Sequence, residues 1–217
     1  MRKLILKMSV TIDGFVGGPN GELDWIFKTL GEDATAWTVD KLWQAGAHLM
    51  GRRTIHDMAA YWPSSTEAFA TPMNDIPKIV FSRKGFTPSQ RGDVTVGFDD
   101  AVRLRRADGS NTASTLPPSA KTWAEAIVAS GDMTQEVMKL KKQSGKDLIA
   151  HGGAGFAQSL AQTGLIDEFW FLTHPVALGH GLPLFSLLPK PLYLKLVSVT
   201  AFRSGAVAHV YHRSAAG

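Results

Sequence analysis

The sequence contains no cysteine. Disulfide bonds, thiol catalysis and thiolate metal sites are therefore excluded. The chain also lacks any run of about 18 uninterrupted apolar residues, so we expect no membrane span. The basic N-terminus does not match a signal peptide, because Lys7 interrupts the apolar run and no small-residue cleavage site follows. A cytoplasmic location is the default expectation.

Positive charge is only slightly in excess over negative charge. The 217 residues carry a net charge of +4, and the pI is near 9.4. The cations are dispersed and form no aromatic–basic platform, so we expect no nucleic-acid partner. The length and the 44% hydrophobic content suit a single globular domain over residues 1–217.

Apolar runs alternate with helical patterns along most of the chain. This order predicts a three-layer α/β/α fold around a mostly parallel sheet. The expected strands are 3–11, 47–50, 78–82, 94–98, 148–150 and 169–173. Helices are expected over about 33–44 and after Asp132, which forms a capping signal with Gln135. Near the C-terminus, 192–202 and 206–212 predict an antiparallel hairpin.

Residues 99–121 break this pattern. The segment is polar, rich in small residues, and contains Pro117-Pro118 near its end. We interpret it as a long surface insertion. A substrate-gating loop or a subunit contact is the alternative.

A glycine-rich turn follows the predicted strand 148–150 and opens a helix. Its residues are His151, Gly152, Gly153, Ala154, Gly155 and Phe156. Glycines let the backbone approach a ligand closely, and a helix N-terminus offers unpaired N–H groups. Together they favour an anion, most often a phosphate. The alternative is a turn that needs glycine only for packing.

Two further strand ends carry cations and hydroxyl groups. Gly51, Arg52, Arg53 and Thr54 follow the strand 47–50. Ser82, Arg83 and Lys84 end the strand 78–82. Open α/β sheets bind ligands at the carboxyl ends of their strands, so these junctions predict one extended dinucleotide site. The positive charge at 82–84 suits a 2′-phosphate and favours NADPH over NADH.

Five motifs, in order, resemble the dihydrofolate-reductase-like superfamily. Within it they are most similar to the reductase domain at the C-terminus of the bifunctional riboflavin-biosynthesis deaminase-reductase. The motifs are 3–13, 51–54, 79–83, 151–154 and 167–173. The resemblance spans roughly Arg2 to Arg213. It implies an NADPH-dependent reductase of a small pterin, folate-like or aminouracil heterocycle. The absent cysteines exclude the zinc deaminase half of the bifunctional enzyme.

The resemblance also implies roles for particular residues. The loop 11–25 is similar to the mobile loop that closes over nicotinamide, and Gly17 on it is assigned to the cofactor. Asp13 is assigned to orient or protonate the substrate. The alternative is a turn aspartate that binds its own loop amides. The residues assigned to the substrate are Asp24, Trp25, Trp62 and Thr173.

One departure from the pattern concerns the substrate. Dihydrofolate reductase grips its pteridine with a carboxylate after this loop, whereas this chain has Leu30 there. Folate is therefore disfavoured as the natural substrate. Residues 24–27 also differ from the W-I-T pattern of the riboflavin-pathway domain.

The remaining expectations concern metals and partners. The seven histidines show no metal-binding spacing, so no metal is predicted. Relatives of the riboflavin-pathway domain form homodimers, and we expect the segment 169–172 and the C-terminal hairpin to pack between subunits. Two alternatives to a reductase stay open: a non-catalytic nucleotide-binding protein on the same fold, and a basic interaction protein.

Overall fold

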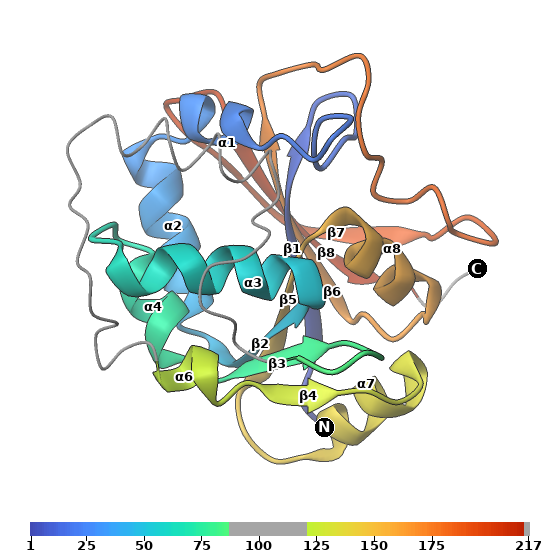
Figure 1. Cartoon of the computed structure of the whole chain (residues 1–217). Helices are drawn as coiled ribbons and strands as arrows, with labels where there is room; N and C mark the ends of the chain where they lie inside the picture. The colour runs from blue at the N-terminus through green and yellow to red at the C-terminus, as the bar shows by residue number, and fades with distance from the viewer. Residues whose placement is uncertain (87–120, 215–217) are drawn as a thin grey trace.

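A computed structural model of the chain describes residues 1–86 and 121–214. The predicted strand 94–98 and residues 99–120 of the predicted insertion lie outside this range. In the described part, eight strands form one sheet in the order β4-β3-β2-β5-β1-β6-β8-β7 (Figure 1). Their bounds are β1 Leu4–Thr11, β2 Ala45–Gly51, β3 Lys78–Phe81, β4 Ile127–Ala129, β5 Asp147–His151, β6 Glu168–His174, β7 Leu194–Ala201 and β8 Val207–Arg213.

The sheet is parallel from β4 to β6 and antiparallel over β6, β8 and β7. The mostly parallel sheet and the C-terminal hairpin predicted from sequence are confirmed. The turn of the hairpin contains Gly205 with φ +83°, a backbone conformation that glycine adopts without a steric penalty. Strand β4 has no counterpart among the predicted strands.

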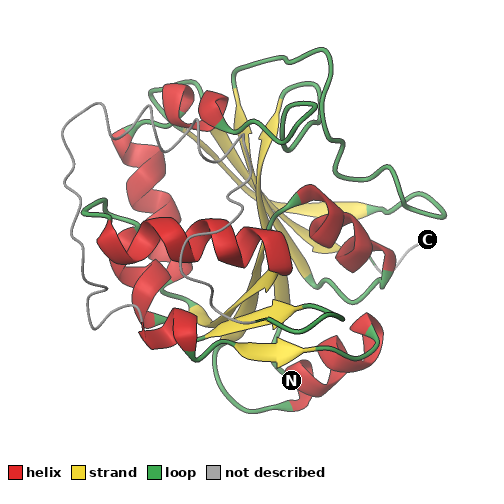
Figure 2. Ribbon diagram, viewed as in Figure 1, coloured by secondary structure: helices red, strands yellow, loops and turns green. Residues whose placement is uncertain are grey.

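Helices cover both faces of the sheet. Figure 1 shows α2, α3 and α4 together on one side and α8 on the other, and the sheet passes between them as one layer (Figure 2). The helices are α1 Asp24–Thr29, α2 Glu32–Leu42, α3 Arg52–Tyr61, α4 Ala70–Asp75, α6 Lys121–Ala124, α7 Met133–Lys142 and α8 Ala154–Gln162. Residues Trp62–Ser64 form a short 3₁₀ helix. The predicted three-layer α/β/α architecture is therefore present.

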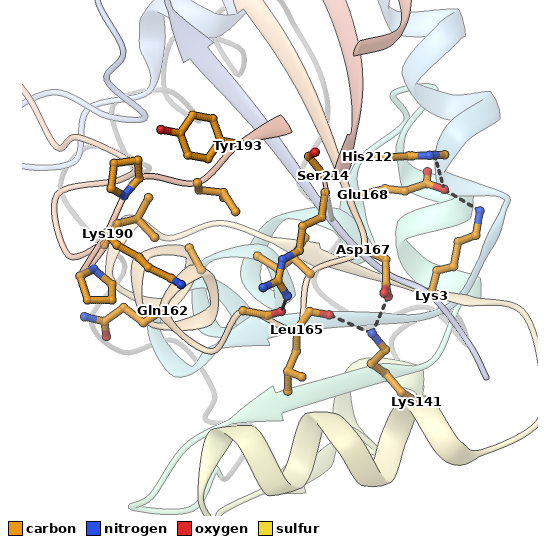
Figure 3. A pocket seen from close by; sticks show the side chains of 18 residues that line it. Lys3, Lys141, Gln162, Leu165, Asp167, Glu168, Lys190, Tyr193, His212 and Ser214 are labelled. Atoms are coloured by element: carbon orange, nitrogen blue, oxygen red, sulfur yellow. Dashed lines mark hydrogen bonds and ion pairs between the residues drawn. The ribbon is translucent and has the colours of Figure 1, made fainter. Parts of the chain in front are cut away.

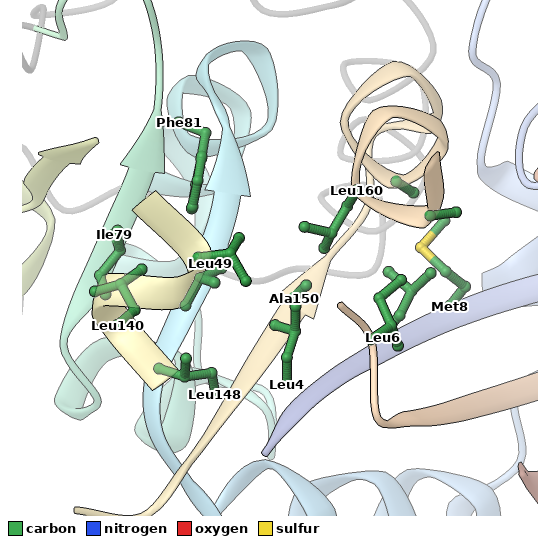
Figure 4. Packing of buried hydrophobic residues seen from close by; sticks show 14 of the residues in the cluster. Leu4, Leu6, Met8, Leu49, Ile79, Phe81, Leu140, Leu148, Ala150 and Leu160 are labelled. Atoms are coloured by element: carbon green, nitrogen blue, oxygen red, sulfur yellow. The ribbon is translucent and has the colours of Figure 1, made fainter. Parts of the chain in front are cut away.

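Strand alternation divides the core between the two faces. Successive side chains of a strand point to opposite faces, so Leu4, Leu6 and Met8 lie on one side and Ile5 on the other. The first side packs against α7 and α8 through Val137, Leu140, Ala157, Leu160 and Ala161 (Figure 4). On the second side, Ile5, Ile149 and Trp170 form one cluster, and Leu42, Met50 and Val80 belong to another.

Local signals set several helix ends as predicted. The Asp132 side chain accepts a hydrogen bond of 3.0 Å from the Gln135 amide at the start of α7. Gly164, with φ +65°, follows the end of α8. Helix α1 was not predicted, and its first two residues, Asp24 and Trp25, were assigned to the loop 11–25.

The loop after β1 is tied to a second loop far along the chain. The Val16 amide donates to the Leu182 carbonyl at 2.9 Å, and the Leu182 amide donates to the Gly17 carbonyl at 2.8 Å. A Cβ on Gly181 would lie 2.4 Å from the Gly17 carbonyl oxygen, so only glycine fits this approach. Both loops lie at the carboxyl edge of the parallel strands.

Across residues 1–86 and 121–214, no helix has the length and apolar character needed to cross a bilayer.

Candidate active site

Two hollows lie at opposite ends of the parallel strands. The larger, about 760 Å³, surrounds the start of β1 and β6 (Figure 3). Four of its charged groups form two ion pairs: Lys141 with Asp167 at 2.6 Å and Lys3 with Glu168 at 2.6 Å. Because ligands of open α/β sheets bind at the carboxyl ends of strands, this amino-end hollow is the weaker candidate.

The second hollow is a cavity of about 490 Å³ at the carboxyl edge. It lies between the sheet and the layer of α1, α2, α3 and α4. Its polar lining residues are Lys7, Ser9, Asn20, Thr38, Arg53, Thr54, Asp57, Trp62 and His151. Its size and largely apolar walls are typical of a small-molecule site. We call it the carboxyl-edge cavity.

Two helix N-termini meet at this cavity. Arg53 and Thr54 at the start of α3 line it, as do Gly152, Gly153 and Ala154 at the start of α8. Neither helix has a side-chain hydrogen bond at its N-cap, and neither has an acidic residue in its first turn. The free N–H groups and the helix dipoles of both ends therefore favour an anion.

The two junctions also contact each other. The Gly153 amide donates to Thr54 Oγ1 at 2.9 Å, and the Gly152–Gly153 peptide bond is cis. A Cβ on Gly153 would lie 2.8 Å from the same Thr54 oxygen, whereas a Cβ on Gly155 would meet nothing within 4 Å. Gly153 is thus fixed by a close approach, and Gly155 faces open space.

Two residues of the predicted phosphate junctions serve packing instead. A Cβ on Gly51 would lie 2.9 Å from the Phe156 side chain, and the Phe156 ring packs against Phe81 at 5.3 Å between centroids. Gly51 therefore makes room for Phe156, and neither residue lines the carboxyl-edge cavity. The sequence alone does not distinguish a glycine that admits a ligand from one that admits a side chain.

The third predicted junction lies beside the cavity but does not line it. Ser82 Oγ donates to the Gly85 carbonyl at 2.6 Å, which ties the turn after β3. Arg83 and Lys84 are exposed at this turn, and Arg52 is exposed at the start of α3. All of them lie at the same edge of the sheet, because β3 pairs in parallel with β2.

Asp13 is placed outside the carboxyl-edge cavity. One carboxylate oxygen accepts from Thr11 Oγ1 at 2.5 Å, and the other accepts from the amides of Leu178 and Gly179 at 2.9 and 2.8 Å. The hydrogen bond from Thr11 is the main cause that lowers the pKa of Asp13. An ionised, fully engaged carboxylate ties two loops together. This position gives Asp13 a role in joining two loops, which differs both from the predicted catalytic role and from a turn aspartate that binds its own loop amides.

Of the residues assigned to the substrate, only Trp62 lines the cavity. Trp25 is buried and packs edge-on against His174 at 5.3 Å. Asp24 pairs with Lys28 at 2.6 Å on α1. Thr173 approaches His209 at 3.3 Å, and its neighbour Leu172 lines the cavity. Strand alternation therefore turns Thr173 to the opposite face of the sheet.

Lys7 is the cavity residue that the sequence analysis missed. It lies in the middle of β1, half-buried, between the buried residues Leu6 and Met8. Among the described residues, no hydrogen-bond or ion-pair partner of its ammonium group is found, and burial lowers its pKa to about 8. A charge within a central strand costs stability without a partner, so a lysine at such a position is itself a signal of function.

A carboxylate also reaches the cavity, from α3. Asp57 is buried and lines it, four residues after Arg53 on the same helix. Leu30, at the position where a pteridine-gripping acid was absent from the sequence, lines the cavity too. The acid of this site therefore comes from a different helix.

Comparisons with known proteins bear on the family and the fold. The RibD C-terminal domain family matches residues 2–208. The uncharacterized protein YyaP of Bacillus subtilis (strain 168) is 32% identical over 211 residues, which cover 97% of this chain and 95% of that protein.

Experimental structures share the fold. A putative riboflavin biosynthesis protein from Shewanella sp. PV-4 has a TM-score of 0.66 at 20% identity, with 99% of both chains covered. A deaminase/5-amino-6-(5-phosphoribosylamino)uracil reductase from Thermotoga maritima has 0.64 at 15%, covering 98% of this chain and 57% of that one. Dihydrofolate reductase from Enterococcus faecalis, complexed with NADP(H), has 0.53 at 12%, covering 98% and 96%. The dihydrofolate-reductase-like fold expected from the resemblance is confirmed.

The buried charge of Lys7 gives a first prediction. Its pKa in the folded chain, about 8, is below the ordinary value of 10.5, so the folded state pays the full cost of the charge below pH 8. Lys7→Met should therefore raise the free energy of unfolding at pH 7, on the order of 1 kcal/mol given the partial exposure. Between about pH 8 and 10.5 the wild type loses this cost, so the gain should shrink. Urea unfolding at pH 7 and pH 10 measures both.

Lys3→Met is the matched control, because Lys3 directly precedes β1 but is paired with Glu168, which raises its pKa. This variant should show no gain at pH 7. A Lys7→Met protein that is less stable than wild type at both pH values would contradict the assignment of Lys7 as an unpaired cation.

Proposed function

The chain belongs to the RibD C-terminal domain family, and we propose that it is an NADPH-dependent reductase of a small nitrogen heterocycle. The observation that carries the proposal is the carboxyl-edge cavity, in which an unpaired lysine lies near two uncapped helix N-termini. The Thermotoga maritima neighbour is named as a uracil reductase, and the Enterococcus faecalis neighbour binds NADP(H). Both names support the same class of reaction.

The residues present fit a phosphorylated dinucleotide. Ala154 and the other free amides at the start of α8 would hold phosphate oxygens next to Gly153, and Arg53 with Thr54 would hold them from α3. Arg83 and Lys84, exposed at the neighbouring strand end, would hold the 2′-phosphate. Gly17, which lines the cavity from the loop after β1, would cover the nicotinamide end. When bound, this cofactor supplies the hydride.

Lys7 is suited to supply the proton. Reduction of a C=N or C=O bond adds a hydride to carbon and a proton to the nitrogen or oxygen. A general acid works best when its pKa lies near the operating pH, and burial lowers the pKa of Lys7 to about 8. Lys7 thus takes the role that the sequence analysis gave to Asp13.

The walls of the cavity indicate a flat, partly apolar substrate. Leu23, Ile26, Phe27, Leu30 and Trp62 line it. Asp57 and Thr38 add polar groups that can bind ring N–H groups. An aminouracil or a pterin matches this cavity, because such a ring has flat faces for the apolar walls and N–H groups at its edge for the polar residues. The leucine at position 30 disfavours folate.

The cofactor assignment predicts opposite outcomes at two glycines. Gly153→Val should weaken NADPH binding about 10- to 100-fold, because its Cβ collides with Thr54 and blocks the phosphate position. Gly155→Ala should bind NADPH as wild type does, because its Cβ meets open space. Fluorescence titration measures both, and circular dichroism confirms folding. Equal NADPH affinities in the two variants would contradict the assignment of Gly153 to the phosphate site. The wild-type protein should bind NADPH more tightly than NADH.

The chemical assignment predicts a separate effect at Lys7. Lys7→Gln should lower NADPH oxidation with a reducible aminouracil or dihydropterin about 10²- to 10⁴-fold, the usual worth of a positioned acid. NADPH affinity should change little, because the phosphate residues lie on other elements. Asp13→Asn should retain turnover as long as the two loops that Asp13 joins keep their positions. If Asp13→Asn loses turnover while Lys7→Gln keeps it, the proton comes from the loop carboxylate after all. NADPH binding without oxidation of any heterocycle would favour a non-catalytic nucleotide-binding protein.

We also propose that the protein is a homodimer, through β7. The segment 169–172 expected at the interface is largely core: Phe169, Trp170 and Leu172 are buried in hydrophobic clusters on the two faces of the sheet. The edge strand β7 instead exposes Leu196, Val197 and Val199 by about half each. Among the described residues it pairs only with β8. A second copy of β7, antiparallel to the first, would pair this edge and cover its aliphatic side chains.

Light scattering tests the dimer. At micromolar concentration we expect a mass of about twice the 23.5 kDa of the chain. Leu196→Glu with Val199→Glu should yield the single-chain mass, since like charges would face each other across the two-fold axis. Leu187→Glu, an exposed leucine away from β7, is the control and should stay dimeric. A single-chain mass for the wild type would refute the proposal.

A further inference from the structure

A pair of histidines lies behind the wall of the carboxyl-edge cavity. His48 in the middle of β2 is fully buried, and His151 at the end of β5 lines the cavity. Nδ1 of His48 lies 2.5 Å from Nε2 of His151. The rings are parallel within 6°, with centroids 4.6 Å apart. Because two stacked rings cannot bring their atoms this close, the rings meet edge to edge in one plane and share a hydrogen bond.

Both rings are held neutral. Burial is the main cause that lowers the pKa of each histidine well below 6.5. The charged groups that act on them are Lys7 on β1 and Lys78 on β3, and both lower these pKa values further. Lys78 is the register partner of His48, and Lys7 is the register partner of His151. Among the described residues, no carboxylate is a cause of either pKa shift.

Two protons are therefore distributed over four ring nitrogens. One proton lies in the shared contact, since two lone pairs would repel each other at this distance. The other is either on Nε2 of His48 or on Nδ1 of His151. Nε2 of His48 is buried without any hydrogen-bond partner in the described chain, and an unpaired buried N–H is costly. Lys78, the register partner of His48, lowers the pKa of this ring and so also disfavours a second proton on it.

The direction of the hydrogen bond between His48 and His151 follows from this distribution of protons. His48 donates its Nδ1–H to Nε2 of His151, and Nδ1 of His151 carries the proton and is the ring nitrogen left to the cavity. His48 has no second proton to pass on, so the pair positions a donor and does not relay protons.

We propose that His48 is a positioning residue that holds His151 as a neutral hydrogen-bond donor to an acceptor atom of the bound heterocycle, a carbonyl oxygen or an unprotonated ring nitrogen. The identity of the ligand rests on the proposed function; the state of the two rings does not. Together with Lys7, its register partner, His151 offers two donors along one wall. A lactam or urea carbonyl edge of a reducible heterocycle presents acceptors that match these donors.

The ring protons can be observed directly by long-range ¹H–¹⁵N correlation on protein labelled with ¹⁵N-histidine, without any ligand. At pH 7 we expect His151 protonated at Nδ1 only, and His48 protonated at Nδ1 only. His48→Asn keeps a donor in the place of Nδ1 and should leave the His151 tautomer unchanged. His48→Leu removes the donor, and His151 should shift toward the Nε2–H tautomer.

A kinetic readout adds the ligand. With the aminouracil or dihydropterin that the wild type reduces, His48→Leu should raise KM about 10-fold with a smaller change in kcat, and His48→Asn should restore KM. A wild-type spectrum with Nε2–H on either ring would overturn the proposal, and so would identical His151 tautomers in the Asn and Leu variants. If the tautomers are as expected but no heterocycle is reduced, the proposed function fails and the histidine assignment stands.

Discussion

The parallel alignment of β3, β2, β5 and β1 is the constraint on which the site depends. Parallel strands bring all their carboxyl ends to one edge, so segments far apart in the sequence become neighbours there. The contact between Gly153 and Thr54 spans 99 residues, and that between His48 and His151 spans 103. The antiparallel hairpin extends the sheet on the other side of β6 without disturbing this edge.

Burying a lysine lowers the stability of a fold, and this chain has two such lysines in its strands, of which Lys7 lines the carboxyl-edge cavity. Lys7 and Lys78 lie within strands, and burial lowers both pKa values, to about 8 and about 7. Lys78 is compensated: its ammonium lies 4.5 Å from the centre of the Trp123 ring and donates to Thr122 at 3.1 Å. Lys7 has no such partner in the described chain. The contrast separates a lysine that is structurally satisfied from one that is left available to a ligand.

The paired charges at the amino end of the sheet have the opposite character. Lys3 and Glu168 neutralise each other, as do Lys141 and Asp167, and His212 Nε2 lies 3.1 Å from the Glu168 carboxylate (Figure 3). These pairs hold the strand starts together and satisfy one another's charges, although their hollow is the larger one. Volume alone therefore does not indicate the site; unsatisfied charge and free amides do.

The sequence by itself determined the local elements. Apolar and alternating runs predicted the described strands except β4, Asp132 with Gln135 predicted the start of α7, and the glycine-rich turn after β5 predicted an anion-binding helix start. These features depend on residues a few positions apart, so they can be deduced from the chain alone. The family resemblance followed from their order.

Only the tertiary structure decided which candidate residues meet. Asp13 accepts amides from residues 178 and 179, Thr173 faces away from Leu172, and Phe156 fills the space above Gly51. Lys7 was noticed in the sequence only as an interruption of an apolar run, because its significance lies in what surrounds it. The physical reason is that burial, pairing and the protonation of a side chain depend on neighbours across the sheet, and their proximity arises from strand order and register, which local sequence does not specify.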